Sequence, residues 1–414
     1  MPTLATGKNC TGCSACMNAC PVSCINMKEN VTGFLYPVVN SDKCINCQKC
    51  EKACPVIKDR IDKDPPEKAF HVIVQYKGKE VLRTSTSGGL FTAISEVIIN
   101  EYQGVVFGAG LTDEYKVVHT YVENAEDLGR LRSSKYVQSE VGEAYKQAKD
   151  FLDSDRVVLF SGTPCQINGL YGYLGIDYDN LITVDVMCRA VPSPKILRKY
   201  IELCNQRFSK IDRFVFRDKG LGYSYSTLAV YGKDNNGKNK IYRRGIESDE
   251  WLRVFFKRYC YRECCYDCMF QNGKRAADLT MWDCFQVYKM APKLNNNLGA
   301  TNVIFWNEKA ERLFVEAKRF VEFQEIQYNP MLHNLFRQPT NKPRIDREQF
   351  FTDADSLGLN EFWKKYAPNS MQIKIKAFLR KASVKLHIHD TIRKAMHKIR
   401  EVRRKYNINK CYGR

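Results

Sequence analysis

The stretch Cys10-Thr-Gly-Cys13-Ser-Ala-Cys16-Met-Asn-Ala-Cys20-Pro21 recurs 34 residues later as Cys44-Ile-Asn-Cys47-Gln-Lys-Cys50-Glu-Lys-Ala-Cys54-Pro55. Each copy spaces its cysteines as Cys-x2-Cys-x2-Cys-x3-Cys-Pro. Thiolates at x2 spacing reach neighbouring iron atoms of one cluster from a single tight loop, and the proline stops the chain from continuing as a helix. Structural zinc sites usually pair two Cys-x2-Cys hooks instead, so the pattern favours iron–sulfur clusters over zinc.

Runs of this form in bacterial-type ferredoxins hold two [4Fe-4S] clusters, and the fourth cysteine of each run ligates the cluster of the other run. The sequence therefore predicts crossed ligation, with Cys10, Cys13, Cys16 and Cys54 on cluster 1 and Cys20, Cys44, Cys47 and Cys50 on cluster 2. Cys24 lies outside the pattern, and we expect it to be a small buried hydrophobic residue. The pattern indicates a protein that transfers electrons.

The composition fits a multidomain protein of a reducing compartment. A chain of 414 residues, 44% of them hydrophobic, is long enough for two or three domains with a sizeable core. Eighteen cysteines at cluster spacings indicate a reducing compartment rather than disulfide bonds. The first residues lack the apolar stretch of a signal peptide, and no run of ~18 apolar residues occurs. We expect a cytoplasmic protein.

The net charge of +19 is concentrated at the end of the chain. Residues 369–414 carry 14 Lys and Arg against Asp390 and Glu401, which leaves +12 in this segment. No base-reading module accompanies the charge, so nucleic acid is not an expected partner. Residues 392, 396, 399 and 402 are apolar at helical spacing, which predicts an amphipathic helix that contacts an anionic membrane at its cytoplasmic face. A solvated charged face, or one that docks on an acidic partner protein, is the alternative.

We divide the chain into a ferredoxin module (1–57), a charged, proline-containing linker (58–68), two parts of a central domain (69–155 and 156–340), and a polar segment with the basic tail (341–414). In the central domain, short β-rich runs alternate with helical stretches, which predicts an α/β domain with a largely parallel sheet. We expect strands at 70–75, 105–108, 157–160, 181–187 and 213–216, and helices at 89–101, 140–152, 194–206 and 308–323. Beyond about 340 we expect irregular structure and then the helical tail.

The central domain contains a second set of cysteines with metal-binding potential. Cys165 and Cys188 each follow an apolar strand, and ligand sites in open α/β sheets lie beyond the carboxyl ends of strands. Cys265 and Cys268 form a Cys-x2-Cys hook, with Cys260 and Cys264 nearby. These four thiolates would suffice for a third [4Fe-4S] cluster, and zinc is the alternative. Separately, the Ser87-Gly88-Gly89 turn before a helix is a potential anion site, although it also fits an ordinary helix cap.

Six stretches resemble the beta-subunit family of coenzyme F420-reducing hydrogenases and dehydrogenases: residues 86–93, 133–139, 162–167, 191–194, 216–219 and 260–283. The resemblance implies a flavoprotein with FAD beside one [4Fe-4S] cluster. It implies Cys165, Cys188, Cys265 and Cys268 as cluster ligands, and Ser87, Gly88, Gly89, Thr92, Ser134, Lys135 and Tyr136 as flavin contacts. Asp283 is the candidate proton donor or partner of a flavin ring nitrogen. Where the family usually has glycine, Trp282 stands here, so we consider the hypothesis that this side chain fills part of the flavin pocket.

The sequence thus predicts an FAD and [4Fe-4S] oxidoreductase that exchanges electrons with an organic or deazaflavin-type substrate. Its electrons would come from a redox partner protein or a soluble donor. In related bacterial members, gene context suggests a link to cell-surface polysaccharide synthesis. The alternative is a non-catalytic electron-transfer subunit that feeds a partner enzyme, and a third possibility is a zinc-stapled binding protein.

Overall fold

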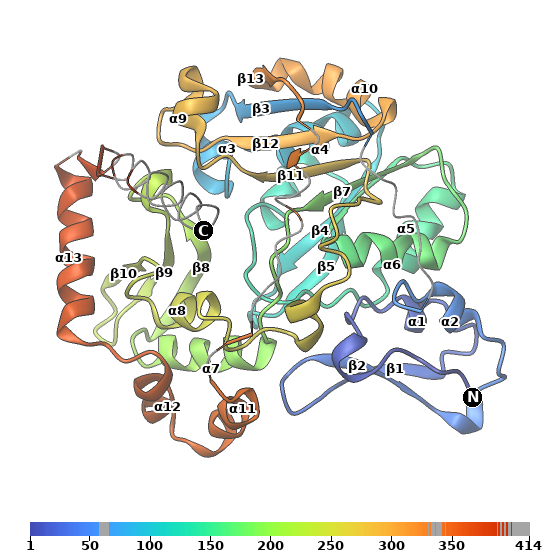
Figure 1. The fold of residues 1–414 in the computed structure, drawn as a ribbon, viewed down its shortest axis with the longest axis horizontal. Helices are drawn as coiled ribbons and strands as arrows, with labels where there is room; N and C mark the ends of the chain where they lie inside the picture. The colour runs from blue at the N-terminus through green and yellow to red at the C-terminus, as the bar shows by residue number, and fades with distance from the viewer. Residues whose placement is uncertain are drawn as a thin grey trace, which may run out of the picture.

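The computed structural model of the chain describes residues 1–57, 66–329, 331–332, 336, 342–343, 345–386, 388–389, 391–392, 395 and 399. Three parts make up the molecule: a small cysteine-rich domain, an eight-stranded sheet with helices on both faces, and a three-stranded sheet with its own helices (Figure 1). Within the described residues, no helix has both the length and the apolar character that a membrane span requires.

The cysteine-rich domain is built from two copies of one local structure. It contains the antiparallel pair β1 (Ile25–Glu29) and β2 (Leu35–Val39) and the short helices α1 (Ala15–Asn18) and α2 (Lys49–Ala53). Equivalent positions of the two repeats adopt the same left-handed backbone, Gly12 matching Asn46 and Ser14 matching Gln48. In each repeat, the two left-handed residues stand between consecutive cysteines and let the loop curl around one point. The sequence repeat is therefore also a structural repeat.

The large sheet has a parallel centre and antiparallel flanks. In spatial order its strands are β13 (Val321–Ile326), β3 (Phe70–Tyr76), β12 (Thr301–Phe305), β11 (Leu279–Asp283), β7 (Leu181–Val186), β6 (Val158–Gly162), β4 (Val105–Leu111) and β5 (Val117–Val122). β11, β7, β6 and β4 are parallel, with Leu279 opposite Val184 and Val158 opposite Leu181. The other neighbouring pairs are antiparallel. The predicted α/β domain is confirmed, with a sheet more mixed than expected.

Apolar helices cover both faces of this sheet (Figure 1). On one face, α4 (Leu90–Asn100) and α10 (Glu308–Ala317) pack on the strand residues that point toward them, such as Val74 and Val303. On the other face, α5 (Ala144–Asp153) and α6 (Pro164–Leu174) pack on strand residues that point the opposite way, such as Phe107 and Phe160. Two shorter helices, α3 (Lys79–Thr84) and α9 (Val287–Met290), lie near β3 and after β11.

The smaller sheet forms a second hydrophobic core. Its antiparallel strands are β10 (Asn239–Arg244), β9 (Thr227–Lys233) and β8 (Lys210–Asp218). The helices that accompany it are α7 (Pro194–Asn205), α8 (Glu250–Phe256), α11 (Arg347–Ser356), α12 (Leu359–Tyr366) and α13 (Met371–Lys385). Tyr200, Trp251, Phe350 and Phe362 are fully buried in this core.

Several sequence predictions need correction. The predicted helix 308–323 ends at Ala317, because Val321–Ile326 pairs with the edge strand β3 instead. The predicted strand 213–216 belongs to the smaller sheet as part of β8. The segment beyond 340 is not irregular, since it contains α11, α12 and α13. In the predicted second half of the basic tail, Met396 and Val402 lie outside the described residues.

Candidate electron-transfer sites

The first cysteine site lies in a cavity between the two repeats. Cys10, Cys13, Cys16 and Cys54 line this cavity of about 330 Å³, together with apolar side chains such as Leu4 and Met27. Burial raises the pKa of the Cys13 thiol to about 12. Iron binds the thiolate, so cluster assembly would have to displace these protons. We call this cavity the inner site.

The second site repeats the arrangement at the outer end of the domain. Cys20, Cys44, Cys47 and Cys50 line a cavity of about 290 Å³, which we call the outer site. In both cavities, three cysteines of one repeat meet the fourth cysteine of the other, which is the crossed grouping that the spacing predicts. Cys24 also lines the outer site, with its Sγ 3.4 Å from the Sγ of Cys20. It is buried as expected, but it is part of the site rather than of the general core.

The spacing of the thiols suits a cluster better than a single ion. Ligands of one zinc ion lie ~2.3 Å from the metal and so stand only about 4 Å apart. Among the described residues, no three Cys, His, Asp or Glu side chains come close enough to share one metal ion. Four cysteines line each of the two sites, and a cubane has four irons that each take one thiolate.

The inner site packs directly on α6 of the large domain. Two glycines of this helix make the contact possible. A Cβ on Gly172 would lie 2.3 Å from the Ala53 carbonyl oxygen of α2, and a Cβ on Gly169 would lie 3.1 Å from the Cys13 Sγ. At such distances only glycine lets the backbones approach, and the contact places Cys13 against the helix that carries Cys165.

A buried arginine connects the inner site to the large domain from another side. The Arg262 side chain is 0% exposed. Its Nε donates to the Cys10 carbonyl at 2.8 Å, and its Nη2 donates to the Leu35 carbonyl at 3.0 Å and contacts the Cys10 Sγ at 3.6 Å. The guanidinium also lies 4.2 Å from the centre of the Tyr36 ring. No carboxylate of the described residues forms an ion pair with Arg262, so a buried positive charge faces the thiols of the inner site.

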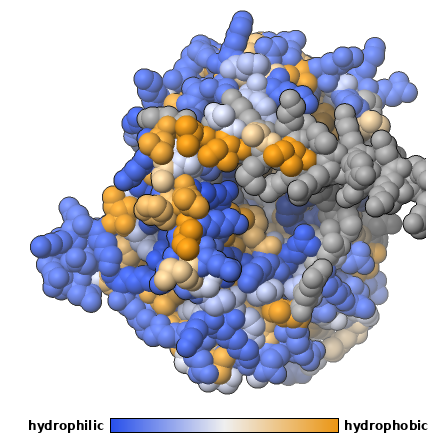
Figure 2. All heavy atoms as spheres, turned by 60° about the vertical axis from the view of Figure 1, so that its left-hand side comes forward, coloured by the Kyte–Doolittle hydropathy of each residue, from blue (hydrophilic) through white to orange (hydrophobic). Residues whose placement is uncertain are grey.

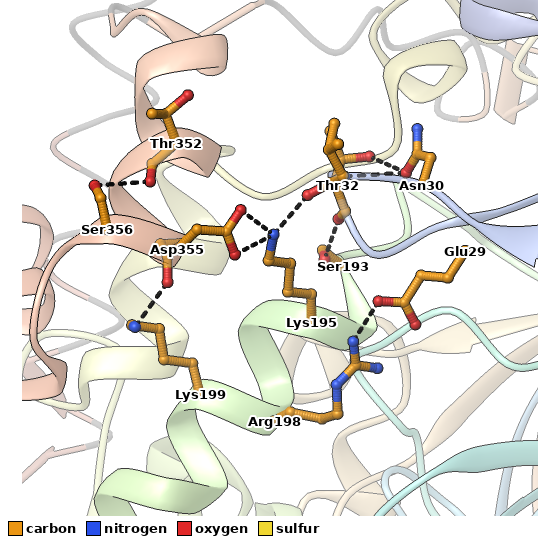
Figure 3. Close-up of polar contacts among 12 residues, drawn as sticks. Glu29, Asn30, Thr32, Ser193, Lys195, Arg198, Lys199, Thr352, Asp355 and Ser356 are labelled. Carbon is orange, nitrogen blue, oxygen red and sulfur yellow. Dashed lines mark hydrogen bonds and ion pairs between the residues drawn. The ribbon is translucent and has the colours of Figure 1, made fainter.

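The β1–β2 hairpin fastens the opposite end of the small domain (Figure 3). Ser193 donates to the Thr32 carbonyl at 2.6 Å, and the Lys195 Nζ lies 2.6 Å from the Asp355 carboxylate and 2.7 Å from the Val31 carbonyl. Arg198 pairs with Glu29. The small domain is therefore held at both ends, by α6 at one and by α7 and α11 at the other.

A third group of cysteines gathers at the carboxyl end of the parallel strands. Cys165 lies in the first turn of α6, directly after β6, where a Thr163–Gln166 capping box and Pro164 start the helix. Cys188 follows the neighbouring parallel strand β7. Cys268 follows the short helical segment η5 (Glu263–Asp267) and is tied in by Gln271, whose Nε2 donates to the Cys188 carbonyl at 3.1 Å.

The thiols of this group act on one another electrostatically. Burial, with the thiols of Cys268 and Cys264 adding to it, raises the pKa of Cys165 to about 12. Burial and Cys264 likewise raise the pKa of Cys268 to about 11. Burial, and then the thiols of Cys165, Cys268 and Cys264, raise the pKa of Cys188 well above its usual value. Cys165, Cys188 and Cys268 thus lie near one another, and their role as ligands of a third cluster stays a prediction.

The fourth member of the third group is one of two adjacent cysteines. The resemblance implies Cys265, whereas Cys264 is the neighbour whose charge acts on the other three thiols. Contact with Cys265, and then burial, raises the pKa of Cys264. Both side chains are buried, so burial does not distinguish them as the fourth ligand.

The residues predicted to hold flavin phosphate have partners within the chain. Ser87 Oγ lies 2.7 Å from Thr301 Oγ1, which also accepts from the Gly88 amide at 2.8 Å. Thr92 Oγ1 accepts from Arg132. The Lys135 ammonium donates to three backbone carbonyls, those of Arg130, Leu131 and Arg132. Gly88 is a glycine because a Cβ there would lie 2.2 Å from the Val74 carbonyl oxygen.

The other predicted flavin contacts are likewise engaged. The Ser134 amide donates to Thr86 Oγ1 at 2.7 Å, and the Tyr136 ring stacks on Phe255 with ring centres 5.1 Å apart. Gly89 caps α4 in a left-handed conformation. These residues lie near one another, and the Ser87 hydroxyl, the Gly88 amide and the Lys135 ammonium have partners within the chain. The role of these residues as flavin contacts stays a prediction.

Asp283 and Trp282 point to opposite faces of the large sheet. Asp283 opposes Thr301, so both share the face of the glycine-rich turn, and Trp282 opposes Asn302 on the other face. Trp282 stacks on His71 there, with ring centres 5.8 Å apart. Trp282 therefore lies on the sheet face opposite the glycine-rich turn, and the hypothesis that it fills part of a flavin pocket stays a prediction.

The Asp283 carboxylate is itself tightly paired. It forms an ion pair with Arg217 and accepts from the Tyr223 hydroxyl at 2.8 Å. Because Arg217 and Tyr223 already engage this carboxylate, its contacts favour a structural role over proton donation.

Comparisons with known proteins agree with this arrangement. Residues 155–329 match the family model described as the C terminus of the beta subunit of coenzyme F420 hydrogenase/dehydrogenase. Residues 9–57 match the 4Fe-4S dicluster domain. A search of curated proteins gave no match. Among solved structures, a chain of the F420-reducing [NiFe] hydrogenase complex from Methanosarcina barkeri is 17% identical, with a TM-score of 0.43, over 70% of this chain and 93% of that chain.

Both sequence matches coincide with structural units. The dicluster match spans both repeats and both cysteine cavities, and the beta-subunit match begins just before β6 and includes all cysteines of the third group. Residues 155–329 are therefore similar to the C terminus of the beta subunit of coenzyme F420 hydrogenase/dehydrogenase, and residues 9–57 form a 4Fe-4S dicluster domain.

Proposed function

We propose that this protein is an iron–sulfur electron-transfer subunit with three [4Fe-4S] sites in series. Electrons pass between the outer site, the inner site and a third site formed by Cys165, Cys188, Cys268 and one of Cys264 and Cys265. When bound, the clusters supply one-electron steps at thiolate-ligated iron. The chain's own contribution is to fix their spacing, exclude water and set their electrostatic surroundings.

The observation that carries this proposal is the buried junction between the inner site and the third group. Cys13 touches α6 at Gly169, one helical turn after Cys165. Arg262 contacts Cys10 on one side and lies within electrostatic range of Cys165 on the other. A path between the two groups thus runs through packed protein, without a solvent gap.

The outer site is the natural place for exchange with a partner. Cys47 is exposed, and Ile45 in the same loop is 61% exposed. A redox partner protein can approach this edge closely, whereas the inner site is covered by the large domain. We therefore assign the outer site to the partner and the third site to the far end of the path.

We favour the electron-transfer alternative over a self-contained FAD oxidoreductase because the Ser87 hydroxyl and the Gly88 amide are engaged with Thr301 and the Asp283 carboxylate is paired with Arg217. In this proposal, the two-electron chemistry belongs to the partner. The organic substrate and the link to cell-surface polysaccharide synthesis rest on the resemblance alone.

Anaerobic purification with measurement of iron, acid-labile sulfide and flavin per chain tests the proposal. About twelve irons, with no flavin after incubation with excess FAD, is the expected result, because three cubanes hold four irons each. About eight irons would remove the third site from the path. One tightly bound FAD per chain would replace the relay by the oxidoreductase function, and zinc instead of iron would overturn both.

A further inference from the structure

Helix α13 stands at the edge of the molecule and touches it with one side only (Figure 1). Arg380 on the inner side pairs with Glu247 at 2.6 Å and lies over the Tyr225 ring at 5.2 Å. Ser383 is the buried residue of the helix, and its Oγ lies 2.9 Å from His389 Nδ1. These contacts fix which side of α13 faces solvent.

The solvent side of α13 is apolar. Its large side chains are strongly exposed: Phe378 by 72%, Met371 by 68%, Leu386 by 67%, Leu379 by 60% and Ile375 by 53%. At about 100° per residue, these positions fall within an arc of roughly 100°, which is one continuous stripe. Figure 2 shows apolar side chains gathered in a band on this side of the molecule. We call these five residues the apolar stripe.

Lys374, Lys381 and Lys385 follow one flank of the apolar stripe, and acidic residues are missing from this part of the sequence. Between residues 371 and 389 the chain has Lys374, Lys376, Lys381 and Lys385 besides Arg380, and neither Asp nor Glu. The ion pairs of the described residues involve Arg380 but none of these four lysines. The solvent side of α13 is therefore both apolar and uniformly cationic.

We propose that α13 is an interfacial helix that binds the surface of an anionic lipid bilayer. The apolar stripe would enter the boundary between headgroups and acyl chains, while the lysines extend along it toward lipid phosphates. Each lysine near an anionic lipid surface adds to the binding free energy, whereas a carboxylate there would be repelled. The absence of Asp and Glu therefore supports the proposal as much as the lysines do. A second copy of the chain is a poor occupant, since an antiparallel or parallel copy would bring lysines against lysines.

This proposal goes beyond electron transfer, and it also orients the molecule. α13 and the small cysteine-rich domain lie at opposite ends of the longest axis (Figure 1). A protein bound through α13 would hold the outer site away from the lipid, open to a partner in solution.

Vesicle flotation of the full-length, iron-loaded protein tests the proposal. The probes are vesicles of phosphatidylcholine alone and vesicles containing about one quarter phosphatidylglycerol, at physiological salt. We expect the wild type to float with the anionic vesicles and at least tenfold less with the neutral ones. The double variant Phe378→Glu/Leu379→Glu should lose at least tenfold in binding to the anionic vesicles.

Two further variants separate the apolar and cationic contributions. Lys374→Glu/Lys381→Glu should bind the anionic vesicles no better than the neutral ones. Val31→Glu, which places the same charge on a 75% exposed residue of the hairpin tip, should bind like the wild type. An unchanged iron content in each variant shows that the fold is intact. Absence of wild-type binding, as expected if an acidic protein covers the stripe, would overturn the proposal, as would unaltered binding of the Phe378→Glu/Leu379→Glu variant.

Discussion

The inner and outer cysteine sites come from the same twelve-residue pattern, yet their surroundings differ sharply. The inner site lies beneath α6 and beside the fully buried Arg262, whereas the outer site ends in an exposed loop with Ile45 and Cys47. Local sequence determines how each loop curls around its metal. What each site is used for depends on what packs against it.

The comparison also gives a direction to electron flow. A buried positive charge stabilises the reduced, more negative state of a nearby cluster. Arg262 contacts Cys10 of the inner site and no cysteine of the outer site. For the proposed relay, we therefore expect the inner cluster to be the better electron acceptor of the two, so that electrons entering at the outer site move inward.

The largest effect is expected from removing a ligand at the far end of the path. Cys165→Ser should lose about four of about twelve irons per chain, while both clusters of the small domain remain. Iron analysis and electron paramagnetic resonance of the reduced protein measure this loss. Cys264→Ser and Cys265→Ser form the matched pair, and we expect the loss to recur in Cys264→Ser. Full retention of iron in Cys165→Ser would show that no third cluster exists.

Next in size is the effect of separating the inner site from α6. In Gly172→Val, the new Cβ would lie 2.3 Å from the Ala53 carbonyl oxygen, which is too close for two non-bonded atoms. Overpacking of this kind costs about 1–3 kcal/mol, because the backbones must move apart. Denaturant unfolding under anaerobic conditions measures the change. Gly129→Ala, where a Cβ meets no atom within 4 Å, is the control and should stay within about 0.5 kcal/mol of wild type. Equal stability of the two variants would argue against a tight junction.

Arg262→Met should act on one cluster and spare the other. Removing the buried charge should lower the midpoint potential of the inner cluster by roughly 50–100 mV, as a Coulomb energy of about 2 kcal/mol gives for a one-electron couple. The outer cluster serves as an internal reference in the same redox titration, and Arg262→Lys should recover part of the shift. Equal shifts of both potentials would mean that the variant disturbs the whole domain rather than the inner site.

The smallest effect is expected at the exposed loop. Ile45→Glu changes the surface that a partner meets and keeps every ligand. Because Ile45 also lines the outer site, the midpoint potential of the outer cluster should fall slightly, while that of the inner cluster should stay unchanged. Electron input from a protein donor should slow severalfold, because a charge in a contact patch acts mainly on the association rate. Stopped-flow reduction by a ferredoxin-type donor, compared with reduction by dithionite, measures this. A slower reaction with dithionite as well would place the effect on the cluster itself.

The sequence predicted what depends on local spacing. The repeat indicated the crossed cysteine groups, and the apolar run before Cys165 indicated a strand that ends at this cysteine. The helix α6 that begins at Pro164 was not predicted, although its Thr163–Gln166 capping box is a recognisable start signal. Parallel strands then brought Cys165 and Cys188 to one edge of the sheet, as the strand-end argument required.

Contacts between distant segments could not be predicted in the same way. Nothing in Arg262 itself tells that it lies against Cys10, 252 positions earlier, or that Gly172 meets Ala53. The Gly169-x2-Gly172 spacing on a helix was a signal of close approach, but it does not name the partner. Lys135 is a second example of a contact that the sequence does not give. The sequence suggested that this cation faces a phosphate, but its ammonium group donates to three backbone carbonyls.

The double fastening of the small domain, at α6 and at the β1–β2 hairpin, has a kinetic consequence. A ferredoxin on a free tether would act as a shuttle, and its transfer rate would depend on linker length and effective concentration. Here Gly172, Ser193 and Lys195 hold the module in one pose, so the internal step takes place at constant distance. In the proposed relay, electron transfer within the chain therefore takes place over a fixed distance. Only the exchange of electrons with the partner protein would depend on protein concentration.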